Sequence, residues 1–197
     1  MKETVPFRKL LRQATRPDSG FSMSARQYRF IARHLPATKS GRILIIGGGR
    51  DTPLWFHCAR GRMTLVENQP AWIPNLDCPV IRPRYAGKVG RWLRRVSVPR
   101  AIRRRWEIVV VDGPTGYSEN CPGRQEPISW AARFGKLVFV HDYNRPWERA
   151  LCDHYLGAPV KTIPFRRGQT DRTLAVFIPV QTVSRRIESG SPSRSKS

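Results

Sequence analysis

Short apolar runs, most of them rich in Val and Ile, recur through this chain and predict the strands of a mostly parallel sheet. Between them, apolar residues recur at the spacing of amphipathic helices, so strands and helices alternate. The runs that predict strands are Ile43–Ile46, Met63–Val66, Pro79–Ile81, Glu107–Val111, Lys136–Val140, Val160–Phe165 and Arg172–Val180.

The segments between these runs predict the helices, and residues 166–171 predict a hairpin-like turn. Alternating strands and helices that end in an antiparallel hairpin are typical of the class I methyltransferase sheet. We therefore expect an α/β, Rossmann-like fold with seven mostly parallel strands, an antiparallel last strand and helices on both faces. The predicted helices are Ser22–Leu35, Pro53–Ala59, Pro70–Ile73, Gln125–Phe134 and Trp147–Leu156.

The length of 197 residues suits one α/β domain, which we place at residues 23–183. Residues 1–22 are predicted to form a basic N-terminal arm or a short helix, and the Ser- and Arg-rich residues 184–197 a disordered basic tail. No apolar run reaches the length of a membrane span, and no signal-peptide core is visible, so the expected location is the cytoplasm. The four cysteines lack zinc-binding spacing and are expected to be reduced thiols.

The net charge of +22 favours polyanionic partners, whether nucleic acid, acidic glycan or an anionic membrane surface. Residues 82–105 carry ten of the lysines and arginines without one acid, and Tyr85 and Trp92 lie among them. Aromatic rings between cations suit a polyanion groove or the stacking of sugars. A solvated face with its aromatic rings packed inward accounts for the same pattern, and the sequence does not decide between the two.

A glycine-rich turn, Gly47-Gly48-Gly49, follows the first predicted strand, where the backbone can pass close to a nucleotide-like ligand. Glu67 ends the next strand, at the position where an acid binds ribose hydroxyls in Rossmann-like folds. The turn continues into Asp51, whose carboxylate would repel a pyrophosphate but can accept hydrogen bonds from an amine. This favours S-adenosylmethionine over NAD as the cofactor. The predicted cofactor-binding residues are Gly47, Gly48, Gly49, Asp51, Glu67 and Asp112.

Three polar side chains follow the fourth and fifth predicted strands: Asp112, His141 and Asp142. The carboxyl ends of neighbouring parallel strands share one edge, so these side chains are expected to converge. Methyl transfer to a hydroxyl needs a general base or a divalent ion held by carboxylates. We therefore predict all three as catalytic residues, with Asp112 and Asp142 as candidate ligands for a divalent metal. For Asp112 alone, capping of its own Gly-Pro turn explains the pattern equally well.

Five segments of the chain resemble the glucuronoxylan 4-O-methyltransferase family in order and spacing. The resemblance runs from about Met23 to Leu156 and is most specific between Asp112 and Arg124. The segments are Gly47-Gly-Gly-Arg-Asp-Thr-Pro-Leu-Trp55, Val66-Glu67, Val111-Asp-Gly-Pro-Thr-Gly-Tyr117, Pro122-Gly-Arg124 and Val140-His-Asp-Tyr-Asn-Arg-Pro146.

The resemblance implies methyl transfer from S-adenosylmethionine to the 4-hydroxyl of a glucuronic acid residue in a polysaccharide or glycan precursor. Tyr117, Arg124 and Arg145 are the predicted substrate-binding residues, because a guanidinium can grip a uronate carboxylate through two hydrogen bonds. The turn reads Gly-Gly-Gly-Arg where plant members usually have Gly-Leu-Gly-His, which leaves the cofactor unchanged and the acceptor open.

Other functions remain alternatives at this point. The net charge suits a nucleic-acid methyltransferase, although the Asn/Asp-Pro-Pro-aromatic motif common in amino-directed enzymes is absent. A basic nucleic-acid-binding protein on a degenerate Rossmann scaffold would not need Glu67 and Asp112, and both are present. An aminopropyltransferase would need an acidic pocket, which a chain with only 14 acidic residues does not suggest.

Overall fold

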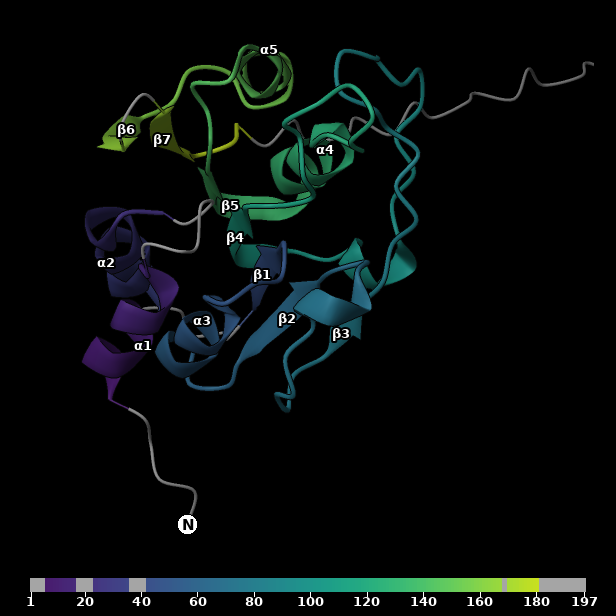
Figure 1. Ribbon diagram of the computed structural model, residues 1–197. Coiled ribbons are helices and arrows are strands. Elements are labelled where there is room, and N and C mark those ends of the chain that lie inside the picture. The colour runs from purple at the N-terminus through teal and green to yellow at the C-terminus, as the bar shows by residue number, and fades with distance from the viewer. Residues whose placement is uncertain (1–5, 17–22, 36–41, 168–169, 181–197) are drawn as a thin grey trace, which may run out of the picture.

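The computed structural model describes residues 6–16, 23–35, 42–167 and 170–180, and its centre is one seven-stranded sheet (Figure 1). The strand order is β3-β2-β1-β4-β5-β7-β6. The strands from β3 to β5 pair in parallel, and β7 runs antiparallel to both β5 and β6. The predicted fold class is confirmed. The bounds are β1 Ile43–Ile46, β2 Met63–Val66, β3 Val80–Ile81, β4 Trp106–Val111, β5 Gly135–Val140, β6 Lys161–Arg167 and β7 Thr170–Phe177.

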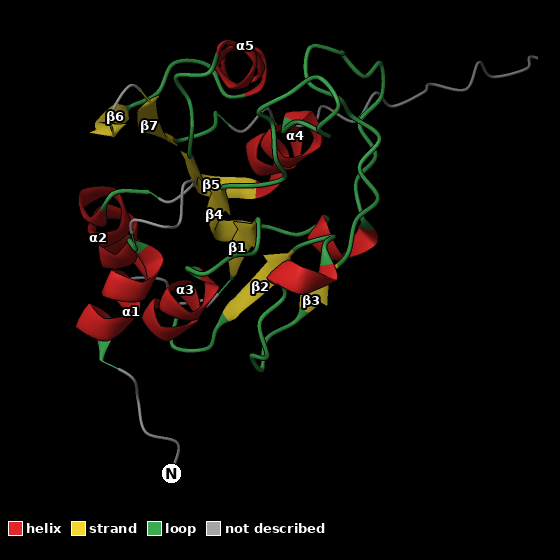
Figure 2. Cartoon of the chain, viewed as in Figure 1, coloured by secondary structure: helices red, strands yellow, loops and turns green. Residues whose placement is uncertain are grey.

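Helices cover both faces of the sheet (Figure 2). The first three pack on one face, and α4 and α5 pack on the other. Side chains alternate along β4 between the two cores, since Ile108 and Val110 belong to one and Val109 and Val111 to the other. This explains why the strands read as continuous apolar runs. The bounds are α1 Phe7–Ala14, α2 Ala25–His34, α3 Thr52–Cys58, α4 Gln125–Phe134 and α5 Pro146–Tyr155, with short 3-10 helices η2 Pro70–Trp72 and η3 Arg100–Ile102.

The N-terminal segment contains a short helix, which is one of the two predicted alternatives. Helix α1 lies within residues 1–22, and its Leu10, Leu11 and Ala14 are buried in the same core as α2 and α3. The hydrophobic side of α1 therefore makes it part of the domain, and the predicted boundary at residue 23 does not separate two packing units. The predicted tail at 184–197 lies outside the described residues.

Helix α2 begins at Ala25 because Ser24 and Gln27 form a capping box, in which each side chain bonds the other residue's backbone N–H. The Gln27 amide also donates to the carbonyls of Ile163 and Arg172, so this helix is tied to the β6–β7 hairpin. None of the helices in the described part of the chain has the length and apolar character needed to cross a membrane.

Candidate active site

A cavity of about 530 Å³ opens at the carboxyl ends of β1, β2 and β4, the edge where open parallel sheets bind their ligands. Its volume lies within the range of ordinary small-molecule sites. Three carboxylates and one arginine line it, in a protein whose net charge is +22. The lining residues are Ala14, Tyr28, Gly47, Gly48, Gly49, Arg50, Asp51, Glu67, Asn68, Gln69, Trp72, Asp112, Gly113, Pro114, Thr115 and Tyr117.

The glycine-rich turn packs tightly against the loop after β4. Gly47 has a φ of 107°, and a Cβ at that position would lie 2.5 Å from the Gly113 nitrogen. A side chain on Gly48 would meet the Trp72 carbonyl oxygen at 2.4 Å. These two glycines therefore bring three loops together around the cavity.

The amide groups of this turn already have protein partners. The Gly47, Gly48 and Gly49 N–H groups donate to the Val66 carbonyl, the Glu67 carboxylate and the Thr52 hydroxyl, at 2.9, 2.7 and 2.9 Å. A pyrophosphate cradle needs such N–H groups for its own oxygens. The turn thus suits a nucleoside ligand without a pyrophosphate, as the sequence predicted from Asp51.

Glu67 lies at the end of β2 with its carboxylate braced from two sides. One oxygen accepts from Gly48 N–H and the other from Gln69 N–H, each at 2.7 Å. A carboxylate has about four lone-pair sites, so both oxygens can accept a further bond from a ligand hydroxyl. Glu67 is therefore held rigidly with capacity to accept further hydrogen bonds, and its contact with a ribose stays a prediction.

Asp51 lies at the opposite end of the turn and is almost fully buried. Its carboxylate accepts from the Trp55 indole N–H at 3.0 Å and the Tyr28 hydroxyl at 3.4 Å. Burial raises the pKa of Asp51 to about 7, and the negative charge of Asp112 adds to the rise. Two carboxylates that repel each other across one cavity favour a cationic ligand, because a positive charge between them would relieve the repulsion.

The Asp112 and His141 side chains converge as predicted. The Asp112 Oδ1 and His141 Nδ1 atoms lie 2.7 Å apart, so the carboxylate accepts the ring N–H. Asp112 lines the cavity with 19% of its side chain exposed, whereas His141 is completely buried behind it. The His141 Nε2 atom has no hydrogen-bond partner among the described residues. Asp112 is therefore the one of the pair that can contact a ligand, and His141 orients it.

Arg124 is buried and fixes the loops on which these residues lie. Its guanidinium donates to the carbonyl oxygens of Pro114, His141 and Asp112 and to the Asp142 carboxylate. The sequence predicted that Arg124 contacts an acceptor carboxylate. This placement does not fit that role, because its donors face the protein and it does not line the cavity. The geometry makes Arg124 a positioning residue that joins the ends of β4 and β5.

Asp142 lies among cations rather than in the cavity. Its carboxylate is 3.1 Å from the Arg124 guanidinium, 2.8 Å from that of Arg145 and 3.5 Å from that of Arg172. Burial by itself raises the pKa of Asp142, but the neighbouring positive charges lower it to about 2. The ionised Asp142 side chain thus anchors the arginines. A substrate would have to pass these arginines to make the predicted catalytic contact with Asp142.

The same contacts test the predicted metal site. Ligand atoms of Asp112, His141 and Asp142 lie within 4.8 Å of one another, which is close enough to hold one ion. A divalent cation there would have to share Asp142 with three guanidinium groups, and His141 already uses its Nδ1 atom on Asp112. Like-charge repulsion of this kind disfavours a cation, so these residues do not fit a metal ion in this arrangement.

The two remaining predicted substrate residues lie on the loops around the cavity. Tyr117 lines it with 66% of its surface exposed, so its ring is available to a bound molecule. Arg145 lies farther back, where it pairs with Asp142 and lies 3.9 Å from the buried Glu148. Arg145 keeps about a quarter of its side chain exposed, so it is nearer to solvent than Arg124.

Two aromatic residues of the cavity were not among the predicted site residues. Tyr28 lies in α2, within the predicted helix Ser22–Leu35, and its hydroxyl reaches Asp51. Trp72 lies in η2, and its indole N–H donates to Gln69 at 3.1 Å. Trp72 could have been predicted from the sequence, because it lies five residues after Glu67, the acid that ends β2. Tyr28 could not, because helical spacing alone does not distinguish a core position from a cavity wall.

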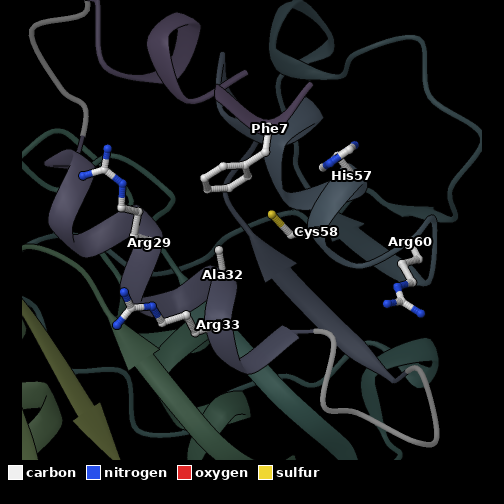
Figure 3. Close-up of a pocket in the computed structure, with 7 residues that line it drawn as sticks. All are labelled: Phe7, Arg29, Ala32, Arg33, His57, Cys58 and Arg60. Atoms are coloured by element: carbon white, nitrogen blue, oxygen red, sulfur yellow. The ribbon is translucent and has the colours of Figure 1, made fainter. Parts of the chain in front are cut away.

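A second hollow, of about 470 Å³, lies between α1, α2 and the end of α3 (Figure 3). Its centre is apolar, with Phe7, Ala32 and Cys58, and Arg29, Arg33 and Arg60 lie at its margin. Figure 3 shows that these three guanidinium groups point away from one another rather than toward a common centre. We therefore assign it no ligand.

Comparison with known proteins confirms the predicted resemblance. The chain is 31% identical to glucuronoxylan 4-O-methyltransferase 3 of Arabidopsis thaliana, over 73% of this chain and 63% of that protein. It is 24% identical to arabinogalactan O-methyltransferase 2 of the same plant, over 72% of this chain and 62% of the relative. The chain thus spans less than two thirds of the length of these relatives. No family model matches the sequence.

Solved structures support the fold. The crystal structure of a candidate RNA methyltransferase from Pyrococcus horikoshii superposes with a TM-score of 0.53 at 13% sequence identity. The alignment covers 87% of this chain and 90% of that protein. At this identity the likeness concerns the fold alone, and it agrees with the predicted class I methyltransferase sheet.

Proposed function

We propose that this protein is an S-adenosylmethionine-dependent O-methyltransferase that acts on a hydroxyl of an acidic, glucuronic-acid-containing polysaccharide or its precursor. The observation that carries the proposal is the acid-lined cavity at the ends of β1, β2 and β4, with Asp112 held by His141 at its wall. The names of the sequence relatives, which are methyltransferases of glucuronoxylan and arabinogalactan, support the class of reaction and of acceptor.

The residues of the cavity fit a positively charged nucleoside cofactor. In this proposal Glu67, which two backbone N–H groups hold in place, accepts hydrogen bonds from two ribose hydroxyls, and Asp51 accepts from the ammonium group of an amino-acid moiety. Trp72 and Tyr117 add aromatic surface at the rim. S-Adenosylmethionine carries both an ammonium and a sulfonium, so the raised pKa of Asp51 marks a position where its binding relieves charge repulsion.

Bound S-adenosylmethionine supplies a methyl group that is activated by the positive sulfur. Asp112 would accept the proton of the acceptor hydroxyl as the oxygen of that hydroxyl takes up the methyl group. His141 donates to Asp112 from behind and fixes its orientation. Arg124 holds the carbonyl oxygens of both residues, so the pair keeps its geometry during turnover.

The proposed acceptor, an acidic glycan, can be tested directly against nucleic acid. Nucleic acid remains the alternative that the net charge suggests, and the two acceptors differ in an assay. Transfer of a labelled methyl group is measured to unmethylated glucuronoxylan and to single-stranded RNA under the same conditions. We expect incorporation into the glycan only. Incorporation into RNA, or into neither polymer, would reject the proposed acceptor. The cytoplasmic location stays a prediction.

A further inference from the structure

The basic segment, residues 82–105, begins beside the cavity. Glu67 N–H donates to the Ile81 carbonyl at 3.0 Å, so Arg82 follows the cavity edge directly. A few residues on, Val89 N–H donates to the Cys121 carbonyl, in the loop that follows Asp112. The segment then passes α4 and ends at the opposite end of the sheet, where β4 begins (Figure 1). It therefore forms a path from the cavity rim along one side of the molecule.

Internal contacts hold this path in place. The Ala86 and Gly87 N–H groups donate to Glu126, and the Gln125 side chain bonds both backbone groups of Leu93. The Trp130 indole N–H donates to the Ser97 carbonyl at 2.7 Å, and Tyr85 stacks on the Trp130 ring. Because the polar backbone groups and apolar side chains face α4, the positive charges are left to face solvent.

The cations of the segment point outward. Of its ten lysines and arginines, Arg105 is half-buried and the other nine are exposed. None of the ten forms a salt bridge with a carboxylate among the described residues. The charge of this path is therefore not neutralised within the described part of the protein. A field of this kind attracts an extended polyanion and weakens with salt.

The side chain of Trp92 lies among these positive charges. Trp92 is 50% exposed, and its other side packs edge-on against the rings of Trp147 and His154, at centroid distances of 5.0 and 5.1 Å. Its chain neighbours Arg91, Arg94 and Arg95 are exposed. A ring that is packed on one side and exposed to solvent on the other can stack on the apolar face of a sugar. The neighbouring guanidinium groups can then bind a carboxylate of the same chain of sugars.

We propose that the basic segment binds several sugar residues of an acidic polysaccharide next to the reacting one, with Trp92 as its stacking platform. This rests on the proposed function and narrows its acceptor to the polymer rather than a single sugar or nucleotide precursor. Within residues 82–105 only Trp92 has a widely exposed ring, since Tyr85 stacks on Trp130. A single exposed ring in the segment favours a glycan over single-stranded nucleic acid, which stacks successive bases on several rings.

Polymer binding is measured on the full chain without cofactor. The probes are unmethylated glucuronoxylan fragments, neutral xylan of matched length, and single-stranded RNA of matched charge, all at about 0.15 M salt. We expect the acidic glycan to bind at least ~10-fold more tightly than the neutral one and more tightly than the RNA. Equal affinity for the two glycans, or tighter binding of RNA, would overturn the proposal.

Charge-reversal variants test whether the acidic glycan binds along residues 82–105. The variant Arg91→Glu/Arg94→Glu/Arg95→Glu changes three exposed arginines of the path, and Arg29→Glu/Arg33→Glu/Arg60→Glu makes the same charge change around the second hollow. We expect the first variant to weaken acidic-glycan binding at least ~10-fold and the second less than ~2-fold. Equal losses in both would show that only net charge matters.

Trp92→Ala separates stacking from charge. We expect it to weaken the binding of acidic and neutral glycans by a similar factor of ~5 or more, with no change in the salt dependence. Circular dichroism and thermal unfolding check that each variant is folded, and unchanged affinity in folded Trp92→Ala overturns the stacking role. Polymer binding without S-adenosylmethionine binding would refute the proposed function alone. Equal methylation of a single glucuronic acid derivative and the polymer would refute this inference alone.

Discussion

The acid-lined cavity and the basic segment carry opposite charges, although the segment begins beside the cavity. In the cavity, Asp51, Glu67 and Asp112 are partly or largely removed from water and held by hydrogen bonds from the protein. In the basic segment the backbone and the apolar side chains are held, while the charged groups extend into solvent.

The two regions differ in whether the protein holds the charged groups themselves at defined positions. A small cationic cofactor needs a few charges at defined positions, and the protein accepts the cost of burying carboxylates to place them. A polymer that binds along a surface needs only a continuous field of one sign. The net charge of +22 reflects basic regions such as residues 82–105 and gives no indication of the three carboxylates in the cavity. The composition alone therefore did not suggest an acidic pocket.

Removing the Asp112 carboxylate, the proposed base for the acceptor hydroxyl, should have the largest effect of the changes in the cavity. Asp112→Asn should lower turnover by ~10² or more, because the acceptor proton loses its base. Single-turnover transfer from labelled S-adenosylmethionine measures the effect. Glu107→Gln, on the same strand but paired with Lys136 at the surface, is the control and should keep full activity. Full turnover in Asp112→Asn would make that residue structural.

Glu67 separates cofactor binding in the cavity from polymer binding on the basic segment. Glu67→Ala should weaken S-adenosylmethionine binding by about 1–3 kcal/mol, the usual cost of losing hydrogen bonds to a charged group. Isothermal titration calorimetry measures it. The Arg91→Glu/Arg94→Glu/Arg95→Glu variant should leave cofactor affinity unchanged. If both variants lost cofactor affinity equally, the two regions would not be separate sites.

Glycines of the two regions should respond differently to a methyl group. Gly113→Ala would place a Cβ 2.6 Å from the Gly47 Cα, so we expect a loss of about 1–3 kcal/mol in the free energy of unfolding, as for overpacked cores. In Gly90→Ala the new Cβ meets no atom within 4 Å, so the free energy of unfolding should fall only by the cost of the positive φ of 74°, roughly 1 kcal/mol. Urea denaturation compares the two. A larger loss in Gly90→Ala would contradict the tight contact between the cavity loops.

The pH dependence of cofactor binding tests the charge of Asp51. Its pKa of about 7 lies above the ordinary value of 3.8, so the folded protein holds a proton there that the unfolded chain loses above pH ~4. Stability from this group is present at low pH and falls as the pH rises toward 7. A cationic ligand prefers the ionised form, so affinity should rise between pH 5 and 7, by at most about tenfold per unit.

Calorimetry from pH 5 to 8 measures this rise, and Asp51→Asn should remove most of it. The variant also controls for titration of other groups in the cavity. A profile that is flat in the parent protein, or equally steep in Asp51→Asn, would show that Asp51 does not meet the cofactor charge.

The sequence by itself determined the sheet and the edge on which the site lies. Apolar runs buried on both faces gave β1, β2, β4 and β5 within one residue, because only parallel strands between two helix layers tolerate such runs. The positions of Glu67 and Asp112 followed from the same pattern, since each directly follows a strand.

Tertiary structure alone decided which of the polar residues can reach a ligand. The sequence predicted Asp112, Arg124 and Asp142 as site residues, yet of these three only Asp112 lines the cavity. Arg124 faces carbonyl groups from segments that meet only on folding, and Asp142 is surrounded by arginines, one of which comes from β7. The same holds for α1, whose Leu10, Leu11 and Ala14 are buried only because they pack in one core with α2 and α3. Local patterns encode strands and turns, whereas burial and charge pairing depend on residues far apart in the chain.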